Sequence, residues 1–473
     1  MRADRGRMIH YALLLMMLAW GLGISLARID YNSVFVDEAY HIVMGRQLAA
    51  GEYCPGCPAH TGSVMTWPLF ASFADSAWGL NGARIMNVVL GLVLTLFIYA
   101  AARLLLGKRC GLLAAGVFIF SGQALYLMKL ATYDMTAAFF LGGALLSAVA
   151  AEKVGDGRLR YAALASASLL LCLAAVTKYL IPAYMPFFVI WVVWRYGITR
   201  AMAFTVFPIV AFMTIFFLYS PYPPNPSVLY QIEEVREVSR LPLVTIMDWT
   251  FRWVALTYLL SVFGLFHGKH RSRAAVLMVF STPILLIHLI TRAEHSVNKN
   301  VVFALIFLAP AAALGIDHIS HIFAMKSRSR GVRLFFTSAV LAIVWSYGLY
   351  NLGWLEKQHP DVTQVIEYFE RRGFDGMTVA TNGWDGVMYE YALEGRYSDI
   401  RFDHITWFIE ECGDGRSLDE RVDFVVCEDD YYGKHYPSAR FGDVLERDCT
   451  LLEDFTISHS WGESHALVFG RRR

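Results

Sequence analysis

Two acidic side chains stand next to each other a few residues after the first apolar run, in "NSVFVDEAYHIVMGRQLAAGEYCPGCPAH". Asp37 and Glu38 interrupt a segment that is otherwise apolar enough to lie on a membrane surface, and His41 follows. If the segment is helical, Asp37 and His41 share one face, because residues four apart are neighbours on a helix. A carboxylate in this position can act as a general base. The alternative is a purely structural role for the pair.

Further charged side chains stand at the edges of later apolar runs. Ionisable groups near membrane depth are costly, and they are therefore functional by default. Acids together with lysines and arginines at one interface can hold a phosphate anion and place a base beside it. The alternatives are that the cations snorkel to the headgroups and that Asp134 caps the helix that follows it. The candidates are Lys129 and Asp134 in "MKLATYDMTAAFF", Lys178 in "AVTKYLIPAY", and Arg292, Glu294, His295 and Lys299 in "TRAEHSVNKN".

The elements that would position these groups are membrane-spanning helices. Of the 473 residues, 56% are hydrophobic and only 17% are charged, and the net charge of +1 does not indicate a nucleic-acid partner. A helix needs about 20 apolar residues to cross the hydrocarbon, and about eleven runs approach this length. They fall near 8–27, 82–106, 110–128, 135–151, 161–177, 180–194, 201–219, 249–266, 274–290, 300–318 and 334–353.

Alternate connections between these runs are basic, which predicts the orientation of the chain in the membrane. Cytoplasmic loops carry an excess of Lys and Arg, and the other connections hold the acids and most loop prolines. We therefore expect a multi-pass protein of the cell membrane with a cytoplasmic N-terminus, an uncleaved signal anchor and an extracytoplasmic C-terminus. The basic residues are Arg2, Arg5, Arg7, Lys108, Arg109, Lys153, Arg158, Arg160, Arg195, Arg200, Lys269, Arg271, Arg273, Lys326, Arg328, Arg330 and Arg333.

The composition changes near residue 355. The stretch after it contains an amphipathic helix pattern, a short β run "MTVAT", a second helical pattern, a buried-strand pattern "RVDFVVCEDD" and a terminal strand pattern "SHALVFGRRR". We expect a transmembrane module over 1–354, with a first outer loop over about 28–81, and a soluble extracytoplasmic α/β domain over 355–473 that is large enough to have its own core.

Cys54 and Cys57 form a CxxC motif in the first outer loop, with His60 close behind. This motif can be a disulfide, half of a metal site or a redox pair. A local disulfide is the first choice because the outer compartment is oxidising. A zinc site would need two more ligands, of which His60 could supply one. No cofactor is expected to be required; a divalent metal remains an alternative that the sequence does not indicate.

The sequence resembles the polytopic GT-C glycosyltransferases, in particular the type of the protein O-mannosyltransferases and aminoarabinose transferases of family 39 and its kin. The resemblance rests on the acidic pair followed by "GRQLAAGEY", "SVMTWPLF" and "ARIMNVVLGLVLTLFIYAAARLL", and on "LATYDMTAAFF", "LCLAAVTKYLIPAYMPFF" and "VNKNVVFALIFLAP". It covers about residues 8–320. The chain departs from the aminoarabinose transferases at "GSVMTWPLF", where they carry a Lys-Pro-Pro-like element.

The resemblance implies a sugar transfer, with inversion, from a polyprenyl-phosphate-linked donor to a glycan, lipid or protein acceptor outside the cytoplasm. It implies Asp37 as the general base and Glu38 as a residue that orients the acceptor or the sugar. The donor phosphate would be held by Lys178 and Lys299, together with Arg84 and His295. Since Asp37 adjoins Glu38 and is partly desolvated, we expect a raised pKa for its carboxyl group. No glycine-rich nucleotide fingerprint is present.

Three other functions remain open from the sequence. A transporter or flippase would show inverted repeats and polar residues at mid-membrane depth, whereas the charged groups here cluster towards one face. A membrane scaffold with a partner-binding outer domain leaves the acidic pair unexplained. A polysaccharide polymerase or ligase would share the lipid carrier but use a different outer loop.

Overall fold

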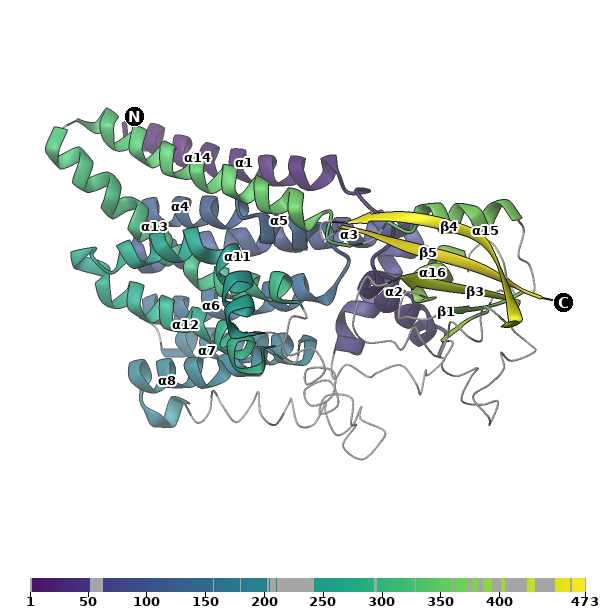
Figure 1. The fold of residues 1–473 in the computed structure, drawn as a ribbon. Coiled ribbons are helices and arrows are strands. Elements are labelled where there is room, and N and C mark those ends of the chain that lie inside the picture. Colours follow the sequence, from purple (N-terminus) through teal and green to yellow (C-terminus); the bar gives the residue numbers. More distant parts are fainter. Residues whose placement is uncertain are drawn as a thin grey trace.

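The computed structural model describes residues 2–51, 63–155, 157–178, 180–201, 204, 210, 242–292, 296–327, 329–359, 361–372, 377–381, 386–393, 401–404, 423–429, 447–459 and 462–472. A bundle of long helices forms one end of the molecule, and a five-stranded sheet with short helices forms the other (Figure 1). Helix α2 (Val36–Ala49), in the predicted first outer loop, lies where the two parts meet.

The bundle is built from apolar helices, and among the candidate membrane spans of the described residues α13 is the most deeply buried. Within the described residues, seven helices are long and apolar enough to cross a membrane, and they coincide with seven of the predicted runs. The bundle elements are α1 (Arg2–Ala27), α3 (Ser63–Leu106), α4 (Lys108–Ile119), α5 (Gly122–Lys129), α6 (Tyr133–Lys153), α7 (Gly157–Thr177), η1 (Ile181–Tyr184), α8 (Met185–Tyr196), α11 (Leu243–Gly264), η2 (Gly268–His270), α12 (Arg271–Thr291), α13 (Val297–Ser327) and α14 (Arg330–Leu355).

One predicted span is broken, and another begins with a 3-10 turn. The run at 110–128 forms α4 and α5, which are bent by 61°, and Ser121 caps the second helix by accepting a hydrogen bond from the Ala124 backbone N–H at 3.3 Å. The run at 180–194 begins with the short helix η1 and continues as α8. The run at 201–219 lies almost wholly outside the described residues, so the total of eleven spans stays a prediction.

Helix α3 is interrupted where the first outer loop was predicted to end. Gly79 has a φ of 66°, in the left-handed region that glycine adopts most readily. The first part of α3 packs against α2 at close range: a side chain on Gly45 would lie 2.0 Å from the Pro68 carbonyl oxygen. This close packing fixes α2, and with it the acidic pair, relative to the bundle.

The basic connections meet at the end of the bundle that lies away from the sheet, here called the basic end. Asp317 of α13 binds Arg109 at 3.0 Å and Arg333 at 2.9 Å, which brings two of these connections together. Glu152 binds Arg195 at 2.9 Å and joins two more. The charge asymmetry in the sequence therefore corresponds to a real spatial asymmetry between the two ends of the bundle.

The C-terminal part is a mixed sheet with two helices. The strands are β1 (Thr378–Thr381), β2 (Arg401–His404), β3 (Phe424–Asp429), β4 (Cys449–His459) and β5 (Gly462–Arg471), and the helices are α15 (Thr363–Arg372) and α16 (Gly386–Leu393). The strand order is β2-β1-β3-β5-β4, with β1 parallel to β2 and β3, and β5 antiparallel to β3 and β4. Val34 and Ala39, from the first outer loop and α2, are buried in the core of this domain. The sheet domain therefore packs directly on the segment that carries the acidic pair.

Candidate active site

Adjacent residues of α2 place their carboxylates in different environments. Glu38 is completely buried. Its two oxygens accept hydrogen bonds from the Phe35 backbone N–H at 2.9 Å and the Ala131 backbone N–H at 2.7 Å. They also accept two bonds from Arg84, at 2.9 Å from Nε and 2.7 Å from Nη2. Glu38 thus ties the start of α2 to α3 and to the segment before α6.

All the N–H groups of the Arg84 guanidinium are engaged in hydrogen bonds. Besides Glu38, it donates to the backbone carbonyls of Ile29 at 2.7 Å, Asn32 at 3.4 Å and Ser33 at 3.1 Å. A guanidinium has five N–H donors, and these contacts occupy all five. Its side chain is 1% exposed. This geometry argues against the predicted contact of Arg84 with a donor phosphate and favours a role in holding the first outer loop.

Asp37 is the more accessible acid of the pair. Its side chain is 39% exposed, and it accepts a hydrogen bond from the nearly buried Lys299 ammonium. Burial raises the pKa of the Asp37 carboxyl group, but the Lys299 ammonium, with a smaller effect of His41, outweighs it and holds this pKa well below its usual range. The expected raised pKa is therefore wrong, because the sequence did not show that a cation 262 residues away pairs with this acid.

A second buried ion pair lies close to the first. Lys178, which follows α7, donates to Asp134 in the first turn of α6, and both side chains are almost fully buried. The Lys178 ammonium also stands over the ring of Tyr133 at 5.0 Å. Lys299 and Asp37 are close enough for their charges to interact with the Asp134 carboxylate. Asp134 therefore has a specific cationic partner, and its other carboxylate oxygen accepts a hydrogen bond at 2.9 Å from the hydroxyl of Thr132, the residue before the helix.

His41 lies against the same pairs. It is 2% exposed and meets the ring of Tyr133 edge to face at a centroid distance of 4.7 Å. As expected from the helical spacing, it is close enough to Asp37 to act on its charge. The residues that the structure brings together from the predicted set are Asp37, His41, Asp134, Lys178 and Lys299.

Lys129 has an acidic partner that was not predicted from the sequence. Its completely buried ammonium donates to Glu356, directly after α14, and Arg28 binds the other oxygen of Glu356 at 3.1 Å. Lys129 also stands over the ring of Tyr31 at 4.8 Å. Glu356 lies at the end of an apolar run, so the rule that selected the other charged groups could have selected it. The arrangement favours a structural role for Lys129 between the bundle and the connection to the C-terminal domain.

The connection between α14 and α15 closes over the first outer loop. The His359 carbonyl oxygen accepts a hydrogen bond from Asn32 at 3.0 Å, and the Val362 N–H donates to the Ser33 hydroxyl at 3.1 Å. The His359 ring lies against Phe35, with centroids 3.7 Å apart. Burial, with the nearby Lys299 charge, lowers the pKa of His359 to about 3. The backbone around Asp37 is thereby held from two sides.

A third contact joins α2, α3 and the C-terminal domain. The buried carboxylate of Asp75 accepts hydrogen bonds from Arg46 of α2 at 2.7 Å and from the hydroxyl of Tyr391 in α16 at 2.6 Å. The Arg46 guanidinium stands over the Tyr391 ring at 5.1 Å. Nothing in the sequence pattern marked Tyr391, because its importance depends on a contact with a residue far away along the chain.

Five predicted residues lie outside the described part of the chain: Glu294, His295, His60, Cys54 and Cys57. The phosphate-binding role of His295 and the disulfide therefore stay predictions. Within the described residues, no group of three His, Cys, Asp or Glu side chains is arranged to hold a metal ion.

Comparison with known proteins identifies the fold. No family model and no curated protein matches the chain. The structure is similar to ArnT from Cupriavidus metallidurans bound to undecaprenyl phosphate, with a TM-score of 0.65 and 13% identity over 96% of this chain and 97% of that chain. It is similar to the oligosaccharyltransferase of Archaeoglobus fulgidus in complex with Zn and sulfate, with a TM-score of 0.56 and 13% identity over 88% of this chain and 68% of that chain.

These similarities confirm the predicted fold class. The chain has the GT-C fold, with a polytopic helical membrane module followed by a C-terminal α/β domain. The similarity to ArnT extends over both parts, because the match covers nearly the whole of each chain.

Proposed function

We propose that this protein is a glycosyltransferase that moves a sugar from a polyprenyl-phosphate-linked donor to an acceptor outside the cytoplasm, with inversion at the sugar carbon. The observation that carries this function is the position of Asp37. It is the partly exposed acid of a buried cluster that also holds two lysines, Lys299 and Lys178. The cluster lies at the junction of an apolar bundle and a C-terminal sheet domain.

Asp37 acts as the general base in this reaction. Its carboxylate takes the proton of the acceptor hydroxyl while the acceptor oxygen forms a bond to the anomeric carbon. The bond from that carbon to the phosphate oxygen breaks on the opposite face, and the lipid phosphate leaves with the electron pair. The pairing with Lys299 keeps Asp37 ionised and ready to accept the proton, although it also makes the carboxylate a weaker base.

Lys178 and Lys299 stabilise the leaving phosphate. The phosphodiester of the donor becomes a monoester, so negative charge develops on it during the reaction. Fixed cations in a site that excludes water stabilise such charge strongly. Both lysines are nearly buried and each is already held by an acid, Asp134 or Asp37, so they are positioned before the donor arrives. The donor phosphate shares these cations with the two carboxylates.

Glu38 and Arg84 position the base rather than take part in the reaction. Their hydrogen bonds hold the start of α2 against the Ile29–Ser33 loop and the backbone at Ala131. This assignment differs from the sequence expectation, in which Glu38 contacted the substrates and Arg84 the phosphate.

Two further observations support the proposed donor and location. ArnT, whose fold this chain shares, was solved with undecaprenyl phosphate bound. In the structure the acidic cluster lies at the opposite end of the bundle from the basic connections, and basic connections favour the cytoplasmic side. The reaction and the C-terminal domain are accordingly assigned to the extracytoplasmic side of the cell membrane.

A transfer assay with the purified full chain tests this function. Polyprenyl phosphate carrying a radiolabelled sugar is incubated with the protein and cell-envelope acceptors, and transfer or release of the sugar is measured. Asp37→Asn keeps the shape of the side chain but removes the base, so we expect a loss of roughly 10²–10⁴-fold in rate. Asp30→Asn, at an exposed acid of the same loop, is the matched control. If wild type and Asp37→Asn turn over donor equally, the proposed function is wrong.

A further inference from the structure

A cavity of about 320 Å³ opens at the basic end of the bundle, far from Asp37. It lies between the end of α6, the end of α8 and the start of α12, and it reaches inwards to Phe307 in the middle of α13. Its volume falls within the range of roughly 300–1,000 Å³ that is typical of small-molecule sites. The cavity is separate from the proposed active site because none of its lining residues belongs to the acidic cluster.

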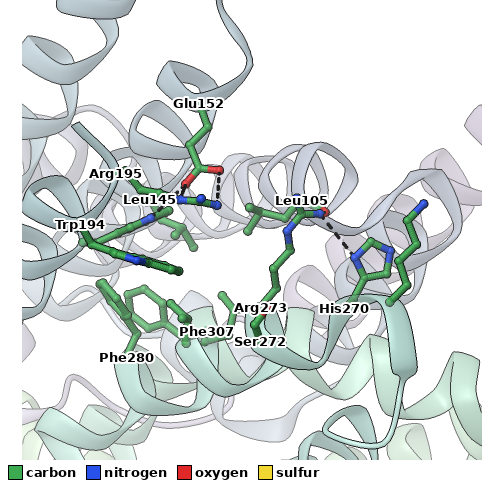
Figure 2. Close-up of a pocket in the computed structure, with 14 residues that line it drawn as sticks. Leu105, Leu145, Glu152, Trp194, Arg195, His270, Ser272, Arg273, Phe280 and Phe307 are labelled. Carbon is green, nitrogen blue, oxygen red and sulfur yellow. Dashed lines mark hydrogen bonds and ion pairs between the residues drawn. The ribbon is translucent and has the colours of Figure 1, made fainter. Parts of the chain in front are cut away.

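The inner wall of the cavity is apolar. Figure 2 shows Phe280, Phe307 and Trp194 gathered on one side of it. Phe280 and Phe307 are buried and their rings lie 5.4 Å apart. The phenyl rings of this wall therefore offer contact to a hydrocarbon chain but no hydrogen bonds. Trp194 is 61% exposed and the Arg195 guanidinium stands over its ring at 4.7 Å, so the aromatic wall continues from the cavity to the surface of the bundle.

The mouth of the cavity carries positive charge. Arg195 is neutralised by Glu152, with contacts of 2.9 Å and 3.3 Å. Arg273 donates from Nη1 to the Leu105 carbonyl and lies 3.4 Å from His270 Nδ1, and no described residue accepts from its other nitrogens. Lys269 makes no hydrogen bond or ion pair with any described residue. Two cations at the mouth are thus left without an acidic partner among the described residues.

We propose that this cavity binds an anionic phospholipid, with the headgroup phosphate at Lys269 and Arg273 and an acyl chain along the aromatic wall. Basic pockets between helices at a membrane surface are suited to anionic headgroups. A guanidinium and an ammonium together match a phosphate better than a zwitterionic headgroup, because the choline cation would stand beside two like charges. The apolar wall favours a lipid over a free phosphate ion. A lipid fills the apolar part of the cavity with its acyl chain, whereas a phosphate ion would occupy only the charged mouth.

Native mass spectrometry of the detergent-purified full chain tests this site. Phosphatidylglycerol and phosphatidylcholine with the same acyl chains are titrated in parallel. We expect phosphatidylglycerol to bind more tightly, and we expect Lys269→Ala/Arg273→Ala to weaken its binding at least about tenfold through the loss of two charge-assisted contacts. Lys108→Ala/Lys153→Ala removes two exposed lysines at the same end but outside the cavity, and it should bind like wild type.

Three results would overturn the assignment. Equal binding of the two lipids would mean that the mouth does not select the headgroup. Equal loss of binding in both double variants would mean that only the general charge of this end matters. Displacement of phosphatidylglycerol by low concentrations of inorganic phosphate would make the cavity a phosphate site. If Lys269→Ala/Arg273→Ala does not fold, Lys269→Ala alone decides, since Lys269 makes no hydrogen bond or ion pair with any described residue.

Discussion

Lys299, in the first turn of α13, donates a hydrogen bond to Asp37 in the first turn of α2, although 262 residues separate them in the sequence. The bundle therefore supplies the cation and the first outer loop supplies the acid. The ion pair keeps Asp37 ionised, and it places the base directly beside a cation that can bind a phosphate. This contact thus joins the proposed general base to a proposed ligand of the leaving phosphate.

The pH dependence of the transfer rate follows from this pair. Because Lys299 holds the pKa of Asp37 below its usual value of about 4, the base stays deprotonated throughout the mildly acidic range. We expect kcat/KM of the wild type to show no loss from protonation of the base between about pH 7 and about pH 5. A raised pKa would instead make the rate fall about tenfold per pH unit below that pKa. A pH–rate profile of kcat/KM distinguishes the two.

Replacement of Lys299 should change both the profile and the donor affinity. In Lys299→Met, burial still raises the pKa of Asp37 but the main opposing charge is gone, so the acidic limb of the profile should move to higher pH. The donor should also bind more weakly, by roughly tenfold or more, because a charge-assisted contact worth about 1.5–3 kcal/mol is lost. Lys357→Met, at an exposed lysine, is the control. An unchanged profile and an unchanged donor KM would mean that Lys299 is not part of the site.

Glu38 and Asp37 should respond differently to the same kind of substitution. Glu38→Gln removes the negative charge beside the buried Arg84 guanidinium, and breaking such a pair typically costs about 3–5 kcal/mol. We expect a lower thermal unfolding temperature for Glu38→Gln, and an activity that falls with the fraction of folded protein. Asp37→Asn should lower the unfolding temperature less, because Asp37 is 39% exposed, and it should slow transfer by roughly 10²–10⁴-fold. A fully stable but inactive Glu38→Gln would move Glu38 into the reaction.

Much of the fold was predictable because the membrane restricts the possibilities. Long apolar runs must be helices, and the alternation of basic connections assigned their ends correctly to one side of the structure. The same physics selected Asp134 and Lys178 individually, since charges at membrane depth need partners. Their pairing could not be read from the sequence, because a contact between α6 and the end of α7 depends on how the helices pack.

The features that were predicted wrongly or not at all also have specific physical causes. Asp37 and Glu38 have the same charge and nearly the same sequence context, and only the surrounding backbone N–H groups and Arg84 show that Glu38 is the buried one. Strand β4 was not predicted, because a register shift between Leu451 and Glu453 breaks the alternation of apolar and polar residues by which strands are recognised. Tyr391 and His359 carried no local signal, since their partners lie more than 300 residues away.

The side of the membrane on which the sheet domain lies can be tested directly. A phosphatase that is active only outside the cytoplasm, fused after Arg473, should be active, because the sheet domain lies at the opposite end of the bundle from the basic connections. A fusion at the α13–α14 connection after Ser327 should be inactive. The reverse pattern would place the proposed active site on the cytoplasmic side and contradict the use of an extracytoplasmic acceptor.

His359 should make the stability of the protein depend on pH. Its pKa is lowered to about 3 in the folded state by burial and by Lys299, whereas an unfolded histidine has a pKa of about 6.5. Between these two values the unfolded state binds more protons, so the free energy of unfolding rises with pH. The stabilisation is complete above about pH 6.5 and is lost progressively towards about pH 3. Between about pH 7 and about pH 5, the loss from this one group is at most about 2 kcal/mol.

Thermal unfolding of the detergent-purified protein measures this effect. The wild type should unfold at a lower temperature at about pH 5 than at about pH 7, and His359→Gln should show a smaller decrease because the titrating group is gone. Asp37 does not interfere in this range, because its lowered pKa places its own titration below about pH 4. His321→Gln removes an exposed histidine of α13 and should keep the wild-type decrease. If wild type and His359→Gln lose equal stability between the two pH values, the connection over the first outer loop does not hold His359 in its neutral form.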